Sequence, residues 1–234
     1  MKGFSCALFV DFDNIYIGLR TMSLEAADAF ARTPRKWFDW FVRWGASEGD
    51  ARRVLVRNVY LNPAQHAWAR DDLLRAGFRV VECPSLTRHN KSSADAHILL
   101  DAVDALAHPY DEIALFSADA DFTPFLWRAR ALDRRTVVLA LGSASLAYTG
   151  SADMVVPEVE FLRDALWMPE TAIPEDGDQG ALLAEMALQL VGLIRTSGDV
   201  AVRDLPKFLR RFPTFTRESN WLGFRSVRRL AEAI

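Results

Sequence analysis

The sequence feature that most constrains the fold is an apolar run that ends abruptly at acidic side chains. Residues 4–10 are almost all apolar, and Asp11, Asp13 and Asn14 follow directly. An apolar run without alternation is typical of a strand that is buried on both faces of a parallel sheet. In open α/β sheets ligands bind beside the carboxyl ends of the strands, so these polar side chains are candidates for a functional site. An Asx turn that caps the next helix is the structural alternative.

Strand and helix patterns alternate along the first 165 residues. Apolar runs predict strands at 4–10, 52–60, 78–83, 112–116 and 136–141, with an edge strand at 154–156. Helical spacing predicts helices at 15–30, 34–44, 63–76, 91–107, 122–132 and 143–149. This alternation predicts an α/β fold in which helices cover both faces of a parallel sheet.

The helix that begins at Pro34 carries a stripe of large aromatic side chains. Trp37, Trp40, Phe41 and Trp44 are spaced at i, i+3, i+4 and i+7, so they share one face of the helix. Most such stripes pack into a core, and we favour that interpretation here. A base-stacking surface for nucleic acid is the alternative.

The last part of the chain differs in composition from the rest. Residues 168–180 are acidic, contain proline and lack an apolar period, which predicts a linker between a first domain at 1–167 and a module at 181–234. The module carries 9 basic and 5 acidic side chains, although the net charge of the whole chain is −3. Three short helices are expected in it, an arrangement typical of small winged-helix modules.

The cysteines and the length of the apolar runs bear on the cellular compartment. Cys6 and Cys83 match no metal-ligand spacing, and two unpatterned cysteines without a signal peptide are typical of a reducing compartment. The run at 4–10 is too short for an export signal or a membrane span. We therefore expect a soluble cytoplasmic protein that does not enter the membrane, whose oligomeric state stays open.

Carboxylates also follow the strand expected at 112–116. Ser117, Asp119 and Asp121 come directly after this apolar run, as Asp11 and Asn14 come after the first one. The carboxyl ends of parallel strands meet at one edge of a sheet, so the two groups are expected to lie close together.

A further carboxylate, Asp95, lies in the helix expected at 91–107. It shares a helical face with Leu99 and Leu106, so it is expected at the top of an inward-facing stripe. An ion pair with Lys91, one turn earlier, is the structural alternative. Asp101 falls on the opposite, polar side, where we expect it to be solvated.

Carboxylates that share a site repel one another unless a proton or a cation neutralises them. Four are expected to meet at this rim of the sheet: Asp11, Asp95, Asp119 and Asp121. Oxygen ligands without a nearby His or Cys cluster favour Mg²⁺ or Mn²⁺ over Zn²⁺. Such a site suits phosphodiester hydrolysis, and Lys91 or Arg88 is a candidate to hold the scissile phosphate.

Taken together, these residues resemble the motifs of NYN domains, which are PIN-like nucleases. The resemblance covers about residues 4–165 and rests on Asp11-x-x-Asn14, Lys91-x-x-x-Asp95 followed by Asp101, and Ser117-Ala-Asp119-Ala-Asp121. It implies a Rossmann-like PIN fold with strand order 3-2-1-4-5 and a metal-dependent endoribonuclease activity. It also implies that the four carboxylates bind the metal, with Asn14, Ser117 and Asp101 in supporting positions. Our first hypothesis is that the substrate is single-stranded RNA.

The module at 181–234 resembles a LOTUS (OST-HTH) module. The resemblance rests on the segments Asp199-Val200-x-Val202-x-x-Leu205 and Asn220-Trp221-Leu222-Gly223-Phe224. Modules of that family bind RNA or protein partners. Arg210, Arg211 and Arg228 are candidates for contacts with RNA phosphates, and a solvated helix surface is the alternative.

Two other functions stay open at this stage. The first is a non-catalytic RNA-binding protein or protein adaptor whose acidic pocket binds metal without turnover. The presence of all four carboxylates favours the enzyme, because a degenerate site is expected to lose at least one. The second is a DNA nuclease with the same metal chemistry, since no side chain that reads a 2′-hydroxyl group is identified.

Overall fold

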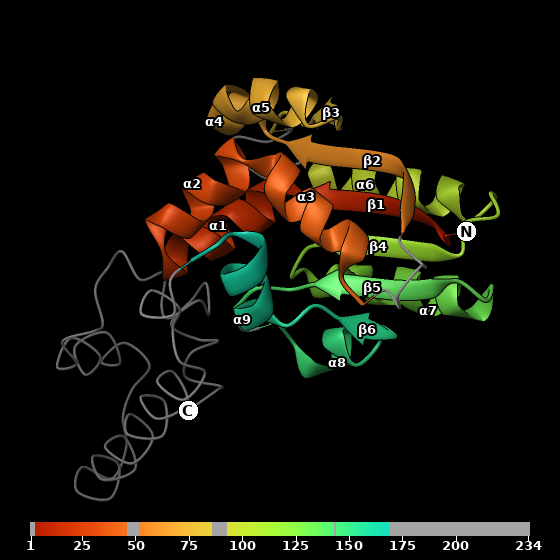
Figure 1. Cartoon of the computed structure of the whole chain (residues 1–234). Helices are drawn as coiled ribbons and strands as arrows, with labels where there is room; N and C mark the ends of the chain where they lie inside the picture. Colours follow the sequence, from red (N-terminus) through yellow and green to blue (C-terminus); the bar gives the residue numbers. More distant parts are fainter. Residues whose placement is uncertain (1–2, 46–51, 86–92, 143, 169–234) are drawn as a thin grey trace, which may run out of the picture. The chain divides into compact units, whose positions relative to one another are not determined.

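Six parallel strands form one sheet in a computed structural model that describes residues 3–45, 52–85, 93–142 and 144–168. The strands are β1 (Ser5–Asp11), β2 (Arg53–Leu61), β3 (Arg79–Glu82), β4 (Glu112–Phe116), β5 (Arg135–Leu139) and β6 (Met154–Val155). Their order is β3-β2-β1-β4-β5-β6 (Figure 1). The expected α/β fold and the strand order 3-2-1-4-5 are confirmed, and β6 is the expected edge strand.

Helices connect successive strands, with α1, α2 and α3 on one side of the sheet and α6 and α7 behind it in Figure 1. The first group is α1 (Phe12–Met22), α2 (Leu24–Arg32), α3 (Pro34–Arg43), α4 (Pro63–His66), the 3-10 turn η1 (Ala67–Ala69) and α5 (Arg70–Arg75). The second is α6 (Ala94–Ala105), the 3-10 turn η2 (Ala120–Phe122), α7 (Thr123–Ala131) and α8 (Leu146–Thr149). The last elements, α9 (Glu158–Glu160) and the π-helical turn η3 (Phe161–Ala165), return to the side of α3, where Phe161 meets Trp40 edge to face at 5.8 Å. No helix within the described ranges has the length and apolar character of a membrane span.

Several predicted features cannot be compared with the structure. The chain divides into two compact units, Met1–Ala172 and Ile173–Ile234, and the fold described here belongs to the first. The module at 181–234 with Arg210, Arg211 and Arg228, nearly all of the linker at 168–180, and both Arg88 and Lys91 lie outside the described residues.

Strand β1 is buried and pairs along its length with β2 on one side and β4 on the other. Its pairing with β2 runs to Asp11↔Tyr60, and its pairing with β4 runs to Val10↔Phe116. Opposite Cys6 and Ala7, β2 contains one extra residue, Leu55, which interrupts the register as a β-bulge. Because β1 and β4 are parallel neighbours, the residues that follow them meet at the same edge of the sheet.

Two of the four residues of the aromatic stripe lie in the core, and Trp40 and Trp44 are partly exposed. Trp37 and Phe41 are fully buried. The ring of Trp37 stacks on Phe30 with 5.2 Å between centroids, and its indole N–H donates to the carbonyl of Phe30 at 3.0 Å. Phe41 meets Phe116 of β4 edge to face at 5.1 Å. The core interpretation is confirmed for Trp37 and Phe41, which are too deeply buried to stack on a base.

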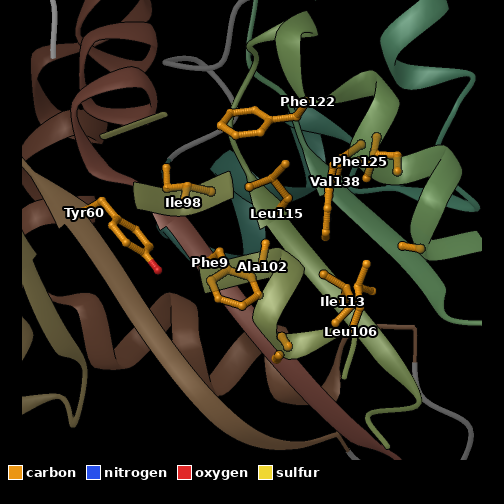
Figure 2. Packing of buried hydrophobic residues seen from close by; sticks show 14 of the residues in the cluster. Phe9, Tyr60, Ile98, Ala102, Leu106, Ile113, Leu115, Phe122, Phe125 and Val138 are labelled. Carbon is orange, nitrogen blue, oxygen red and sulfur yellow. The ribbon is translucent and has the colours of Figure 1, made fainter. Parts of the chain in front are cut away.

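A second apolar cluster fills the opposite face of the sheet, beneath α6 and α7. Figure 2 shows Ile98 and Ala102 of α6 beside Phe9 of β1 and Leu115 of β4, with Phe125 of α7 next to them. All five side chains are buried. The sheet is therefore covered on both faces, which is the usual state of a parallel sheet.

The inward face of α6 differs from the predicted one. Its buried residues are Ala94, Ile98, Ala102 and Ala105, whereas Leu99 is 41% exposed. The predicted inward stripe is therefore wrong at Leu99, whereas Ala102 and Leu106, its other apolar members, are buried as expected. Apolar residues of α6 occur on several of its faces, so the sequence pattern alone does not show which face is buried. The small alanines of the buried face let the helix lie close to the sheet.

Two predicted helices are interrupted in the structure. The prediction of one continuous helix at 15–30 is wrong. Ser23 has an extended backbone (φ −156°), and its hydroxyl accepts the N–H of Ala26 at 3.2 Å. This bond makes Ser23 the N-cap of a second helix. The helix expected at 63–76 is likewise divided into α4, η1 and α5.

A buried ion pair stabilises one end of the sheet, opposite the rim at which β1 and β4 end. Glu112, at the start of β4, has no exposed surface and lies between Arg52 Nε at 2.5 Å and Arg135 Nη2 at 2.7 Å. Arg52 also donates to the carbonyls of Phe41 and Trp44 at the end of α3, a favourable place for a cation. A buried charge is tolerated when it is paired and hydrogen-bonded in this way.

We expect Glu112→Gln to lower the free energy of unfolding by about 3–5 kcal/mol, because it leaves the buried guanidinium of Arg52 without a counter-charge. Urea unfolding at neutral pH measures this change. Asp39→Asn is the matched control, because it breaks an exposed ion pair with Arg35 and is expected to have little effect. A loss for Glu112→Gln as small as that of the control would contradict the role assigned to this ion pair.

Candidate functional site

Asp11 is the last residue of β1 and the N-cap of α1. Its Oδ1 accepts the backbone N–H of Asn14 at 3.1 Å, and its Oδ2 accepts the hydroxyl of Ser117 at 3.3 Å. Only 4% of the residue is exposed. Asp11 therefore does cap α1, as the structural alternative expected, but the cap uses only one of its two carboxylate oxygens. The carboxylate is buried at the end of the central strand.

Hydrogen bonds join the end of β1 to the end of β4. The hydroxyl of Ser117 accepts the N–H of Asp119 at 3.2 Å, and the amide oxygen of Asn14 accepts the N–H of Ala118 at 2.9 Å. Asp119 in turn caps η2 by accepting the N–H of Asp121 at 2.9 Å. Asn14, Ser117 and Asp119 thus lie around Asp11, whereas Asp121 is exposed at the edge of this group.

The surroundings of Asp11 disfavour its charged form. Burial raises the pKa of this carboxyl from its usual 3.8 to about 7. The hydrogen bond from Asn14 opposes the rise in pKa, while the negative charges of Asp95 and Asp13 add to it. The charged form of Asp11 is therefore disfavoured mainly because it is buried, and in addition because two carboxylates act on it.

Asp95 and Asp101 both lie on α6 but have different surroundings. Asp95 is half-buried in the first turn of the helix, and its charge acts on Asp11. Asp101 accepts the hydroxyl of Tyr60 at 2.6 Å and the side-chain N–H of Asn58 at 3.1 Å. The prediction of a solvated Asp101 is therefore wrong, since this half-buried carboxylate binds two side chains of β2.

Asp13 makes contacts that were not predicted. Its Oδ1 lies 2.7 Å from Nδ1 of His66, and its two oxygens accept the backbone N–H of Asn62 at 3.2 and 3.1 Å. Asn62 follows β2 directly and is the N-cap of α4. Asp13 therefore links the ends of β1 and β2, and an Asn-Pro pair at the end of a strand was the available sequence signal.

The donor set around Asp11 fits a divalent cation that prefers oxygen ligands. Among the described residues, no three His, Cys, Asp or Glu side chains lie close enough together to hold a metal ion. Mg²⁺, however, retains several waters and is commonly bound through one or two carboxylates. Asp11 is one such carboxylate, and a cation beside it would relieve the repulsion by Asp95 and Asp13 that helps to raise its pKa.

Comparisons with known proteins bear on this arrangement. A crystal structure of a protein of unknown function from Vibrio parahaemolyticus matches with a TM-score of 0.49 and 21% identity, over 67% of this chain and 95% of that chain. Comparison with curated proteins gave no match. The family model of the NYN domain matches residues 5–157, a range that contains all six strands. The chain therefore belongs to the NYN domain family.

Proposed function

We propose that this chain is a divalent-metal-dependent endoribonuclease that hydrolyses phosphodiester bonds in single-stranded RNA. The observation that carries the proposal is the buried carboxylate of Asp11 at the end of the central strand, linked through Ser117 to Asp119. Membership of the NYN family, which belongs to the PIN-like nuclease superfamily, supports a nuclease in general.

The proposed ligands of Mg²⁺ or Mn²⁺ are Asp11, Asp95, Asp119 and Asp121. When bound, such an ion would offset the negative charge that develops on the scissile phosphate. Hydrogen bonds from Asn14 and Ser117 hold Asp11 in place, so this ligand needs no rearrangement during the reaction.

Three further residues complete the proposed site. Asp101 is proposed to support it from a distance by fixing Tyr60 and Asn58 of β2 against α6. Lys91 and Arg88 are proposed to bind the substrate phosphate, a role that suits cationic side chains. Both follow β3 in the sequence, and so come after a strand that ends at the same rim.

A second candidate function is an RNA-binding protein or adaptor without turnover. It is favoured by one observation, that no group of three metal-binding side chains is preformed among the described residues. A DNA nuclease would use the same chemistry. Incubating the purified protein with labelled single-stranded RNA or DNA, in Mn²⁺, Mg²⁺ or EDTA, separates these functions, since cleavage of RNA that EDTA abolishes is expected only of the ribonuclease.

We expect Asp119→Asn to reduce RNA cleavage by about a hundredfold or more, because it removes a charge from the proposed metal site and leaves the fold intact. Single-turnover cleavage in Mn²⁺ measures the effect. Asp101→Asn is the comparison, and a much smaller loss is expected because that carboxylate binds Tyr60 and Asn58. Wild-type cleavage by folded Asp119→Asn would overturn its assignment as a ligand, and equal losses would make Asp101 a ligand as well.

In EDTA, we expect Asp11→Asn to make the protein more stable at pH 8 by at most about 4 kcal/mol. The pKa of Asp11 is about 7 in the folded protein and near 3.8 when unfolded, so the charged form is disfavoured by folding. Its contribution to stability is therefore present below pH 4 and is lost as the pH rises through 7. Thermal unfolding from pH 4 to pH 8 measures the difference, which should vanish at the acidic end.

Asp153→Asn is the matched control and is expected to have the opposite effect. Burial alone would raise the pKa of Asp153, but hydrogen bonds from Thr136 and Arg130 hold it below its usual value. Charged Asp153 therefore stabilises the fold at pH 8, and its replacement should lower the melting temperature there. Equal melting temperatures of wild type and Asp11→Asn at pH 8 would show that Asp11 is solvated rather than buried.

We also propose that the C-terminal module, which resembles a LOTUS module, binds RNA phosphates through its arginines. Replacing Arg210, Arg211 and Arg228 with Ala in the full-length chain should weaken RNA binding. Each lost phosphate contact should reduce the slope of log K against log salt by about 0.7. Binding titrations in EDTA at several salt concentrations measure this slope. An unchanged slope and affinity would indicate that the module binds a protein partner instead.

A further inference from the structure

Trp68 is a large, partly exposed aromatic side chain that connects to the candidate site through a chain of contacts. It lies in η1, two residues after His66, and 38% of it is exposed. Its ring centroid is 5.5 Å from that of Tyr16, and Tyr16 is 5.0 Å from His66. Since His66 contacts Asp13, these rings lead from the rim of carboxylates to the surface.

The rings around Trp68 are held in defined positions. Phe12 is fully buried and stacks on Tyr16 at 5.6 Å with an interplanar angle of 9°. Phe12 also packs against His66 at 5.3 Å, and the indole N–H of Trp68 donates to the carbonyl of Gln65 at 3.2 Å. A fixed aromatic surface loses little conformational entropy when a ligand stacks on it.

A cation accompanies this aromatic surface. The guanidinium of Arg32 lies 4.5 Å from the centre of the Trp68 ring and 3.5 Å from the carboxylate of Asp72. The Arg32 side chain is 56% exposed, and Asp72 also pairs with Arg75 at 2.8 Å, so Asp72 keeps a partner if the guanidinium of Arg32 binds a phosphate instead. An aromatic ring beside a cation is the combination by which proteins bind single-stranded nucleic acid.

We propose that Trp68 stacks on an unpaired base of the RNA strand whose phosphate lies at the carboxylate rim, and that Arg32 binds a phosphate of the same strand. The inference rests on the proposed nuclease function and adds to it a position that selects single strands. Bases in a duplex are stacked on one another and cannot offer a face to Trp68, whereas unpaired bases can.

Trp127 is the matched control for this proposal. It is even more exposed, at 59%, but it lies on α7, which packs against the opposite face of the sheet from α1. Among the ring contacts between described residues none involves Trp127, so no series of stacked rings joins it to Asp13. Comparing variants of Trp68 and Trp127 therefore distinguishes the loss of a tryptophan beside the site from the loss of any exposed tryptophan.

The test is binding of a fluorescently labelled single-stranded oligoribonucleotide to the full-length protein in EDTA, where cleavage is not expected. Trp68→Ala should weaken binding about tenfold without changing its salt slope, and Trp68→Phe should retain most of the affinity. Arg32→Gln should reduce the salt slope by about 0.7. Trp127→Ala should bind like the wild type, and duplex RNA should bind all four variants weakly and equally.

Each outcome of this test has a distinct meaning. If the wild type binds and cleaves single-stranded RNA but Trp68→Ala binds it equally well, the stacking role fails while the nuclease function stands. An equal loss in Trp127→Ala also overturns it. If the wild type neither binds nor cleaves RNA, the nuclease function and the stacking role both fail. Thermal unfolding of each variant verifies that a loss of binding is not a loss of fold.

Discussion

The polar chemistry of this chain depends on the parallel pairing of β1 with β4. Because the two strands end at the same edge, Asp11 and Ser117 form a hydrogen bond although they are 106 residues apart in the sequence. The sheet buries a carboxylate at each end of this pair. At one end Glu112 is neutralised by two arginines, and at the other Asp11 is surrounded by further acids. The buried charge of Glu112 is thus compensated within the chain. For Asp11 we propose that a divalent cation supplies the compensating charge.

The sequence predicted the parts of this arrangement that depend on a single strand. The strand at 112–116 has the predicted bounds, and β1 ends next to the polar residues where its apolar run stops. Polar residues lie at both ends of each of these short apolar runs, so the pattern predicts where the strand begins and ends. Asp11, Asn14, Ser117 and Asp119 could therefore be assigned to one rim, since each is the last residue of a buried strand or follows its end within three residues.

Features that depend on packing between elements could not be predicted in this way. The inward face of α6 was predicted wrongly at Leu99, because Leu99 and Ile98 are both apolar and only contact with the sheet decides which is buried. The contact of Asp13 with His66 joins residues 53 positions apart and follows from the path of the chain after β2. The partly exposed ring of Trp68 was not predicted for the same reason, since its place near Asp13 depends on contacts with Tyr16 and His66 rather than on a periodic pattern.

The bulge in β2 has a consequence for how this strand can vary in length among relatives. Side chains alternate between the two faces of a sheet, so loss of one residue within a regular strand moves every later side chain to the other face. Leu55 is an extra residue opposite Cys6 and Ala7, and it is exposed. Its deletion would leave Asn58 and Tyr60 facing Asp101 of α6. A gap in an alignment at position 55 is therefore compatible with the same fold, whereas a gap between residues 56 and 60 implies a rearranged strand.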